Sequence, residues 1–110
     1  VQGFGNVGSV AAKLLEQEKI FFVREFRFCG ERRWRADFRI HDSNVLVEVE
    51  GGVWKYGRHQ RPQGFENDAE KYNAAILLGY KLLRFTPAMI QDGRAMITVK
   101  AALTMGKDLK

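Results

Sequence analysis

Three carboxylates lie within one short stretch whose pattern predicts two adjacent β-strands. Residues 34–50 read WRADFRIHDSNVLVEVE, in which apolar and polar residues alternate on both sides of the polar sequence HDSN. Because side chains of a strand alternate between its two faces, Glu48 and Glu50 point to the same face of the second strand. Asp37 lies in the first strand, among arginines. Acidic residues on one face of a strand repel one another, so this stretch needs a positive partner, and a divalent metal ion would be one.

The wider pattern predicts a single α/β (α+β) domain. A chain of 110 residues can bury one hydrophobic core but not two. We expect the domain to span residues 1–110, with a glycine-rich lead-in at 1–8 and a frayed tail at 106–110. Between them the predicted elements are a helix at 9–19, strands at 21–28, 34–40 and 45–50, a helix at 66–79, a strand at 81–86 and a helical region from Pro87 onwards.

The segment 66–80, ENDAEKYNAAILLGY, gives the clearest helical pattern in the chain. Asn67 or Asp68 is suited to cap its start, and Gly79 to close its end. Lys71 and Ala75 fall on a face next to the predicted buried stripe. That stripe consists of Ala69, Tyr72, Ile76 and Leu77.

Charge and cysteine content limit the partners and the compartment. The formal net charge is +5 and the sequence pI is about 9.6, which favours an anionic partner, with nucleic acid ahead of a membrane surface. A single cysteine cannot form an internal disulfide and excludes a cysteine-based zinc site. No apolar run approaches the length of a membrane span. We therefore expect a cytoplasmic protein, located in the host cytoplasm if the chain is phage-encoded.

A basic loop is predicted directly after Glu50. Its sequence, VWKYGRHQRPQGFE, combines positive side chains with Trp54 and Tyr56, a composition suited to phosphates and unstacked bases. Loops of this length are usually functional in compact domains, although a solvated charged loop is the alternative. The candidate DNA-binding residues are Lys55, Arg58, His59 and Arg61 from the loop, with Arg33 and Arg35 from the strand before it.

The first residues contain a second, shorter motif. Gly3, Gly5 and Gly8 in VQGFGNVGSVAA resemble the dinucleotide-binding turn of the glutamate dehydrogenase family, in which glycines let the backbone approach a pyrophosphate. No strand–helix–strand repeat follows the motif. A lead-in to the first helix is therefore the favoured interpretation, and binding of a dinucleotide the alternative.

A longer resemblance covers most of residues 24–86. The segments RRWRADFRI, VEVEGGVW, GRHQRPQGFENDAEKYNAA and GYKLLRFT, in this order of elements, resemble the PD-(D/E)xK nuclease superfamily, especially small phage and bacterial endonuclease-like proteins and Holliday junction resolvases. The resemblance implies a restriction-endonuclease-like core in the order αβββαβ, with helices flanking a central mixed sheet. It also implies a Mg²⁺- or Mn²⁺-dependent DNA endonuclease that cuts branched or duplex DNA, and a homodimer if the protein is a resolvase.

The resemblance assigns roles to individual residues. The first acid of the family pattern matches Asp37 and the second matches Glu48. The third position, which is often lysine, is Glu50, and an acid there is implied to be a further oxygen ligand of the metal together with the Val49 carbonyl. Lys71 on the following helix is then the candidate for the missing lysine.

Several alternatives stay open at this stage. Lys71 is equally suited to pair with Glu70 or Asp68 on a solvated helix face, and Glu16 or Glu18 of the first helix is a further candidate near the metal. The acids would instead form an internal charge network if their partners were Arg33, Arg35 and Arg39. A chain without the usual lysine is also compatible with a catalytically inactive DNA-binding module of the same fold.

Overall fold

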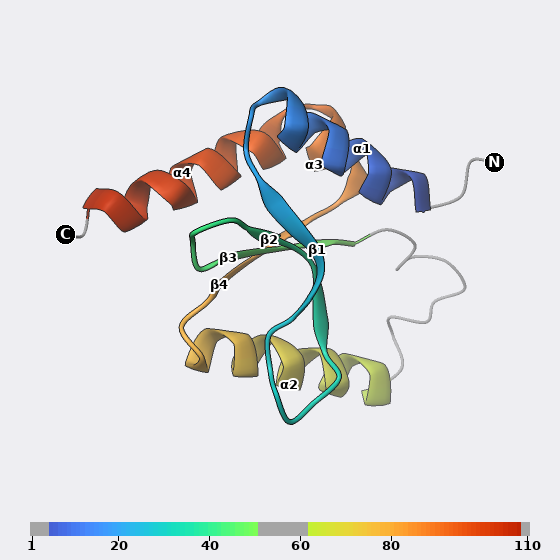
Figure 1. Cartoon of the computed structure of the whole chain (residues 1–110). Coiled ribbons are helices and arrows are strands. Elements are labelled where there is room, and N and C mark those ends of the chain that lie inside the picture. The colour runs from blue at the N-terminus through green and yellow to red at the C-terminus, as the bar shows by residue number, and fades with distance from the viewer. Residues whose placement is uncertain (1–4, 51–61, 109–110) are drawn as a thin grey trace.

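Helices lie on both faces of one four-stranded sheet (Figure 1). The computed structural model describes residues 5–50 and 62–108. Its elements are α1 (Gly5–Gln17), β1 (Phe22–Arg27), β2 (Arg35–Ile40), β3 (Val45–Val49), α2 (Pro62–Leu77), β4 (Lys81–Phe85), α3 (Pro87–Gln91) and α4 (Arg94–Asp108). The predicted α/β class, the αβββαβ order and the mixed sheet are confirmed.

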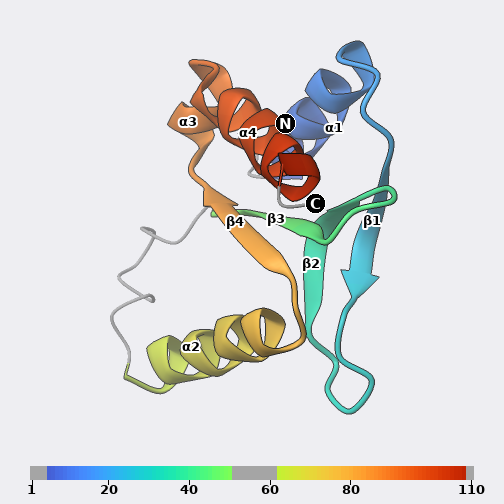
Figure 2. The ribbon, with the colours of Figure 1, turned by 90° about the vertical axis from the view of Figure 1, so that its left-hand side faces the viewer.

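The sheet contains both antiparallel and parallel strand pairs, because the connection between β3 and β4 crosses one face of the sheet. β1, β2 and β3 follow one another along the chain and pair antiparallel. The chain then passes through α2, so that β4 returns parallel to β3 (Figure 2). Glu48 lies beside Arg84 in this register, and Val49 beside Phe85. Since neighbouring residues of paired strands point to the same face, Arg84 shares the face of Glu48.

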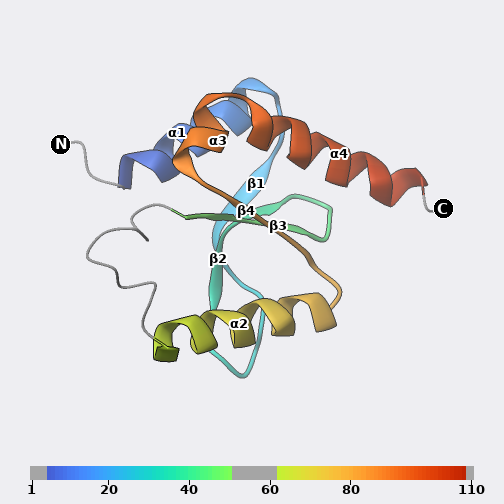
Figure 3. The ribbon, with the colours of Figure 1, turned by 180° about the vertical axis from the view of Figure 1, so that it is seen from behind.

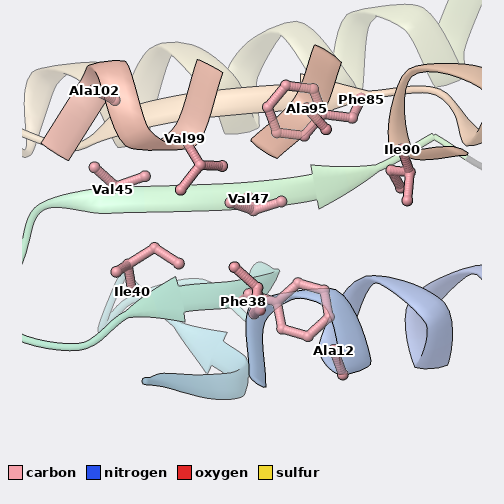
Figure 4. Close-up of a cluster of buried hydrophobic side chains, with 11 residues drawn as sticks. Ala12, Phe38, Ile40, Val45, Val47, Phe85, Ile90, Ala95, Val99 and Ala102 are labelled. Atoms are coloured by element: carbon pink, nitrogen blue, oxygen red, sulfur yellow. The ribbon is translucent and has the colours of Figure 1, made fainter. Parts of the chain in front are cut away.

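Two apolar clusters hold the helices to the sheet. From behind, α1, α3 and α4 lie on one side of the sheet and α2 on the other (Figure 3). The cluster beneath α1, α3 and α4 includes Phe38, Ile40, Val45, Val47, Phe85 and Val99 (Figure 4). The cluster on the α2 side contains Phe28, Ala36, Leu46 and Ala75. Val45 and Val47 therefore face away from Leu46, as the alternation in β3 predicted.

The first and last helices extend further than predicted. α1 begins at Gly5 instead of Ser9, so Gly5 and Gly8 are helical residues and do not form a turn before a helix. The strand after α1 pairs antiparallel with its neighbour, whereas a dinucleotide-binding unit needs a parallel one. The dinucleotide alternative is therefore wrong for this fold, although Gly3 lies outside the described residues. α4 continues to Asp108, beyond the predicted start of the tail at residue 106.

Helix α2 differs from its prediction in both its start and its buried face. It begins at Pro62, five positions before the predicted cap at Asn67, because proline fits the first helical turn, where no backbone donor is needed. Of the predicted buried stripe, Ala69 and Tyr72 are partly buried, but the prediction is wrong for Ile76 and Leu77, which are 57% and 86% exposed. Among the residues of α2 whose burial is described, Ala75 is fully buried, and its small side chain lets the helix approach the sheet closely. No helix in the described part of the chain is long and apolar enough to cross a membrane.

The end of α2 provides a test of the fold. Gly79 has a φ of +96°, and its N–H donates to the Ile76 carbonyl while that of Tyr80 donates to Ala75, each at 3.0 Å. These are the two bonds of a glycine-dependent helix cap. A Cβ added at Gly79 would meet no atom within 4 Å, so the effect of Gly79→Ala reports backbone strain.

We expect Gly79→Ala to lower the free energy of unfolding by about 1–2 kcal/mol, the cost of a left-handed conformation for alanine. Urea denaturation followed by circular dichroism measures this change. Gly30→Ala is the matched control, because Gly30 also has open space around it but no positive φ. Equal stability of the two variants would contradict the assigned cap.

Candidate functional site

A largely buried ion pair joins β3 to α2. Nζ of Lys71 donates a hydrogen bond to Oε2 of Glu48 at 3.0 Å, and the two side chains are only 17% and 12% exposed. Lys71 and Ala75 lie one helical turn apart, so the face of α2 that packs Ala75 against the sheet also carries Lys71 to Glu48. The structure thus brings together two residues to which the sequence assigned a common site.

Asp37 lies at the point where β2 and β3 separate. The β2–β3 ladder contains the pairs Phe38–Val47 and Arg39–Leu46. Beyond it, Oδ2 of Asp37 accepts a hydrogen bond from the backbone N–H of Val49 at 2.7 Å. The carboxylate therefore replaces a ladder bond, and it fixes the end of β3 beside Glu48.

Glu50 is paired with a residue of the neighbouring strand. Nε of Arg84 donates to Oε2 of Glu50 at 2.6 Å, and the guanidinium carbon lies 4.2 Å from the ring centroid of Tyr72. Neither Arg84 nor Tyr72 was predicted to belong to the site, and Tyr72 was expected only in the buried stripe of α2. The position of Arg84 follows from two sequence features. Alternation in KLLRF places Arg84 on the same face as Leu82. A helix that crosses between two strands predicts that the second strand, β4, runs parallel to the first, β3.

Burial and like charge perturb the acids of this site. The pKa of Glu48 is raised to about 7, chiefly because the carboxylate is buried, and the charges of Asp37 and Glu50 raise it further. The charge and hydrogen bond of Lys71 act in the opposite direction. Burial, followed by the charge of Glu50, likewise raises the pKa of the Tyr72 hydroxyl above its usual range. Burial therefore outweighs the effect of Lys71 on the pKa of Glu48.

The predicted arginine network is wrong for these acids. Arg35 lies 3.8 Å from Glu25, and Nε of Arg39 donates to the Ser43 carbonyl at 3.1 Å. Arg33 is exposed. The partners of the acids are instead Lys71, Arg84 and the Val49 N–H.

Other residues that the sequence placed at or near the site lie elsewhere in the structure or outside its described part. Glu70 pairs with Arg32 at 3.7 Å, so the solvated Lys71–Glu70 pair is wrong. Glu18, just after the end of α1, pairs with Lys100 of α4. Glu16 is exposed near the end of α1, which packs on the face of the sheet opposite α2. The predicted DNA-binding residues Lys55, Arg58, His59 and Arg61 lie outside the described residues.

The donor atoms near Asp37 suit a hard cation. Asp37 and Glu48 supply carboxylate oxygens and Val49 a carbonyl, and Mg²⁺ commonly takes one or two protein carboxylates and completes its shell with water and substrate oxygens. Among residues 5–50 and 62–108, no group of three or more His, Cys, Asp or Glu side chains is arranged to hold a metal. This agrees with Glu50 being turned towards Arg84. In the described part of the chain, Asp37 and Glu48 are therefore the carboxylates of this site that remain for a metal ion, and binding of one stays a prediction.

A concavity of about 610 Å³ lies at the other end of β3, beside His41, Asn44, Val45 and Leu103. Its ionisable neighbours His41 and Asp42 are exposed and lie 3.5 Å apart. Both side chains are more than half exposed, whereas Glu48 at the carboxyl end of β3 is 12% exposed.

A solved structure with the same fold is the catalytic domain of the homing endonuclease I-Bth0305I. The match covers 89% of each chain with a TM-score of 0.62, at 16% sequence identity. A scan against protein-family models and a comparison with curated proteins each found no match. The chain therefore has a nuclease-like fold, and its closer resemblance to resolvases stays a prediction.

The raised pKa of Glu48 makes stability depend on pH. The carboxyl ionises at 4.5 in an unfolded chain and at about 7 in the fold, so the folded state holds the proton more tightly between these values. In metal-free buffer, the Glu48 contribution to the free energy of unfolding should fall as the pH rises through this window. The loss is at most roughly 3 kcal/mol, because one pKa unit corresponds to about 1.4 kcal/mol.

The effect is measured by urea denaturation at several pH values in this range. It is the difference in the free energy of unfolding between the wild type and Glu48→Gln. Stability of the variant should depend less on pH, whereas Glu70→Gln, which alters an exposed ion pair, should behave as the wild type does. Parallel pH profiles for the wild type and Glu48→Gln would show that Glu48 is not perturbed.

Proposed function

We propose that the protein is a metal-dependent endonuclease that hydrolyses phosphodiester bonds of DNA at Asp37 and Glu48. The observation that carries the proposal is the largely buried Glu48–Lys71 pair, which lies beside Asp37 at the end of β3. Perturbed ionisable groups of this kind are typical of catalytic sites. The shared fold with a homing endonuclease catalytic domain supports a nuclease in particular.

Asp37, Glu48 and the Val49 carbonyl would hold Mg²⁺ or Mn²⁺. When bound, the ion would polarise the scissile phosphate, stabilise its developing negative charge and lower the pKa of the attacking water. The hydrogen bond from Val49 to Asp37 would orient the carboxylate before the ion arrives. Because the pKa of Glu48 is about 7, binding of the ion should strengthen as the pH rises and Glu48 loses its proton.

Lys71 supplies the positive charge that the third position of the family pattern lacks. Its ammonium group has three N–H donors, and the bond to Glu48 uses one of them. The others are suited to orient a water molecule or a phosphate oxygen next to Glu48. Lys71 would therefore position the nucleophile, while the neighbouring carboxylates hold the metal.

Binding to the DNA backbone would come from the positive surface. The formal net charge is +5, and Arg27, Arg32, Arg33 and Arg35 of the β1–β2 hairpin are exposed. Such contacts make binding salt-dependent and largely independent of sequence. Lys55, Arg58, His59 and Arg61, which lie outside the described residues, are proposed to contact DNA as well. The narrower proposal is a Holliday junction resolvase, which would act as a homodimer because two strands must be cut symmetrically.

An inactive DNA-binding module is the second candidate. In the described part of the chain, Glu48 and Glu50 already have cationic partners, and three acidic ligands do not converge. A pure binding module would shift DNA in a gel without cutting it in Mg²⁺ or Mn²⁺. Cleavage by the wild type would exclude this candidate.

We expect Asp37→Asn and Glu48→Gln each to lower the cleavage rate by at least about a hundredfold, while DNA binding is largely unchanged. The assay uses duplex, single-stranded and four-way-junction DNA with Mg²⁺ or Mn²⁺, and the cuts are mapped on both strands. Asp92→Asn is the control, because it removes the same charge from an exposed pair with Arg94. Retained cleavage in both site variants would refute the assignment, and paired symmetric cuts in the junction would identify a resolvase.

Replacement of Lys71 tests the role of the lysine. Lys71→Met should lower kcat by about a hundredfold to ten-thousandfold, the range for residues that assist proton transfer, with a small change in KM. Lys100→Met is the matched control, because Lys100 also pairs with a glutamate but is exposed on α4. A kcat equal to that of the control would leave Lys71 with only a structural role.

A further inference from the structure

The guanidinium of Arg84 lies at the solvent-facing edge of the carboxylate site. The parallel register places Arg84 beside Glu48 on the α2 side of the sheet. Its side chain is 48% exposed, whereas those of Glu48 and Lys71 are nearly buried. An anion that approaches from solution can therefore reach Arg84 without displacing the Glu48–Lys71 pair.

Two contacts fix the orientation of this guanidinium. Its Nε donates to Glu50 at 2.6 Å, and its central carbon lies over the Tyr72 ring, 4.2 Å from the ring centroid. Glu50 is itself fixed, because its backbone N–H donates to the Phe85 carbonyl at 2.8 Å and its side chain is 16% exposed. A guanidinium held in this way loses little conformational freedom when it binds an anion.

The bond to Glu50 leaves the outer edge of the guanidinium available. Arginine carries five N–H donors, and the bond to Glu50 uses the one on Nε. Within the described residues, no hydrogen bond from the two Nη atoms of Arg84 is found. These atoms present parallel N–H groups, the arrangement that matches two oxygens of a phosphate.

We infer that Arg84 binds a phosphate of the DNA backbone, and that Glu50 positions Arg84 instead of binding the metal ion. This inference rests on the proposed function, since it assigns a DNA phosphate to the space next to Glu48. It explains why an acid at the third position is compatible with the site. The carboxylate of Glu50 is turned towards Arg84, which leaves Asp37 and Glu48 as the acidic ligands.

The direct test is the side-chain Nε–Hε resonance of Arg84, observed by NMR in isotope-labelled wild-type protein. Addition of inorganic phosphate, and separately of a short DNA duplex, should shift this resonance more than that of Arg94, an exposed arginine paired with Asp92 in a similar way. Arg84→Lys identifies the signal by its loss. Absence of a selective shift with both ligands would overturn the inference, whether or not the protein cuts DNA.

Binding measurements test the same contact through affinity. In metal-free buffer, Arg84→Gln should weaken DNA binding about tenfold, the effect of one charged hydrogen-bonding group. It should also reduce the salt slope of log K by about 0.9, the value for one phosphate contact. Arg84→Lys should restore part of the affinity, and Arg94→Gln, with the same change in charge, should have a smaller effect. Equal losses in Arg84→Gln and Arg94→Gln would refute the phosphate contact.

Glu50→Gln separates a positioning role from a metal ligand. The amide oxygen can still accept from Arg84, so DNA affinity should be maintained, and Mg²⁺ affinity measured by titration calorimetry should equal that of the wild type. Glu48→Gln should weaken Mg²⁺ binding in the same experiment. A comparable loss in both variants would assign Glu50 to the metal and overturn its positioning role. If the wild type binds phosphate at Arg84 but does not cut DNA, the proposed function fails while this inference stands.

Discussion

The burial of Glu48 is the constraint on which the arrangement of this molecule depends. A carboxylate on a central strand beneath a helix loses its hydration, and it is tolerated only with a partner or a bound proton. Lys71 is that partner, and it can reach Glu48 only if α2 presents one particular face to the sheet. This orientation places Ala75 in the interface and leaves Ile76 and Leu77 in solvent. The ion pair and the small residue thus determine how the helix is rotated, against its own apolar pattern.

The same region shows how a sheet can hold acidic side chains together. β3 is antiparallel to β2 and parallel to β4, and the two ladders bring different groups to its carboxyl end. The separation of β2 frees the Val49 N–H for Asp37, while the parallel register brings Arg84 to the level of Glu48. A site made by three strands and one helix is fixed by backbone pairing. Its acids can therefore stay close together despite their repulsion.

Local sequence patterns predicted the strands well and the helix contacts less well. Alternation in residues 34–50 gave the correct faces of β3, because each residue's direction follows from the pleat alone. The buried face of α2 does not follow from its apolar residues in the same way. It also depends on Glu48, which belongs to another element and lies beneath the helix. The place of Arg84 in the site was not predicted for a related reason. Its position beside Glu48 depends on the crossover through α2 and on the register of β3 with β4, which bring together residues that are distant in the chain. Lys71 was identified through a family resemblance, and the helix periodicity alone left it on a neighbouring face.

The two cations of the site differ in burial, and this difference separates their roles. Lys71 is enclosed with Glu48, where its charge opposes the effect of burial on the carboxyl pKa without abolishing it. Arg84 is half exposed, and its partner Glu50 still raises the pKa of Glu48. When all three acids are ionised, they exceed their two cationic partners by one charge. A divalent ion bound by Asp37 and Glu48, as proposed, would neutralise this excess and release the proton that Glu48 holds near neutral pH. A phosphate bound by Arg84, as inferred, would then lie at the edge of the same site, which is the arrangement that hydrolysis of a phosphodiester requires.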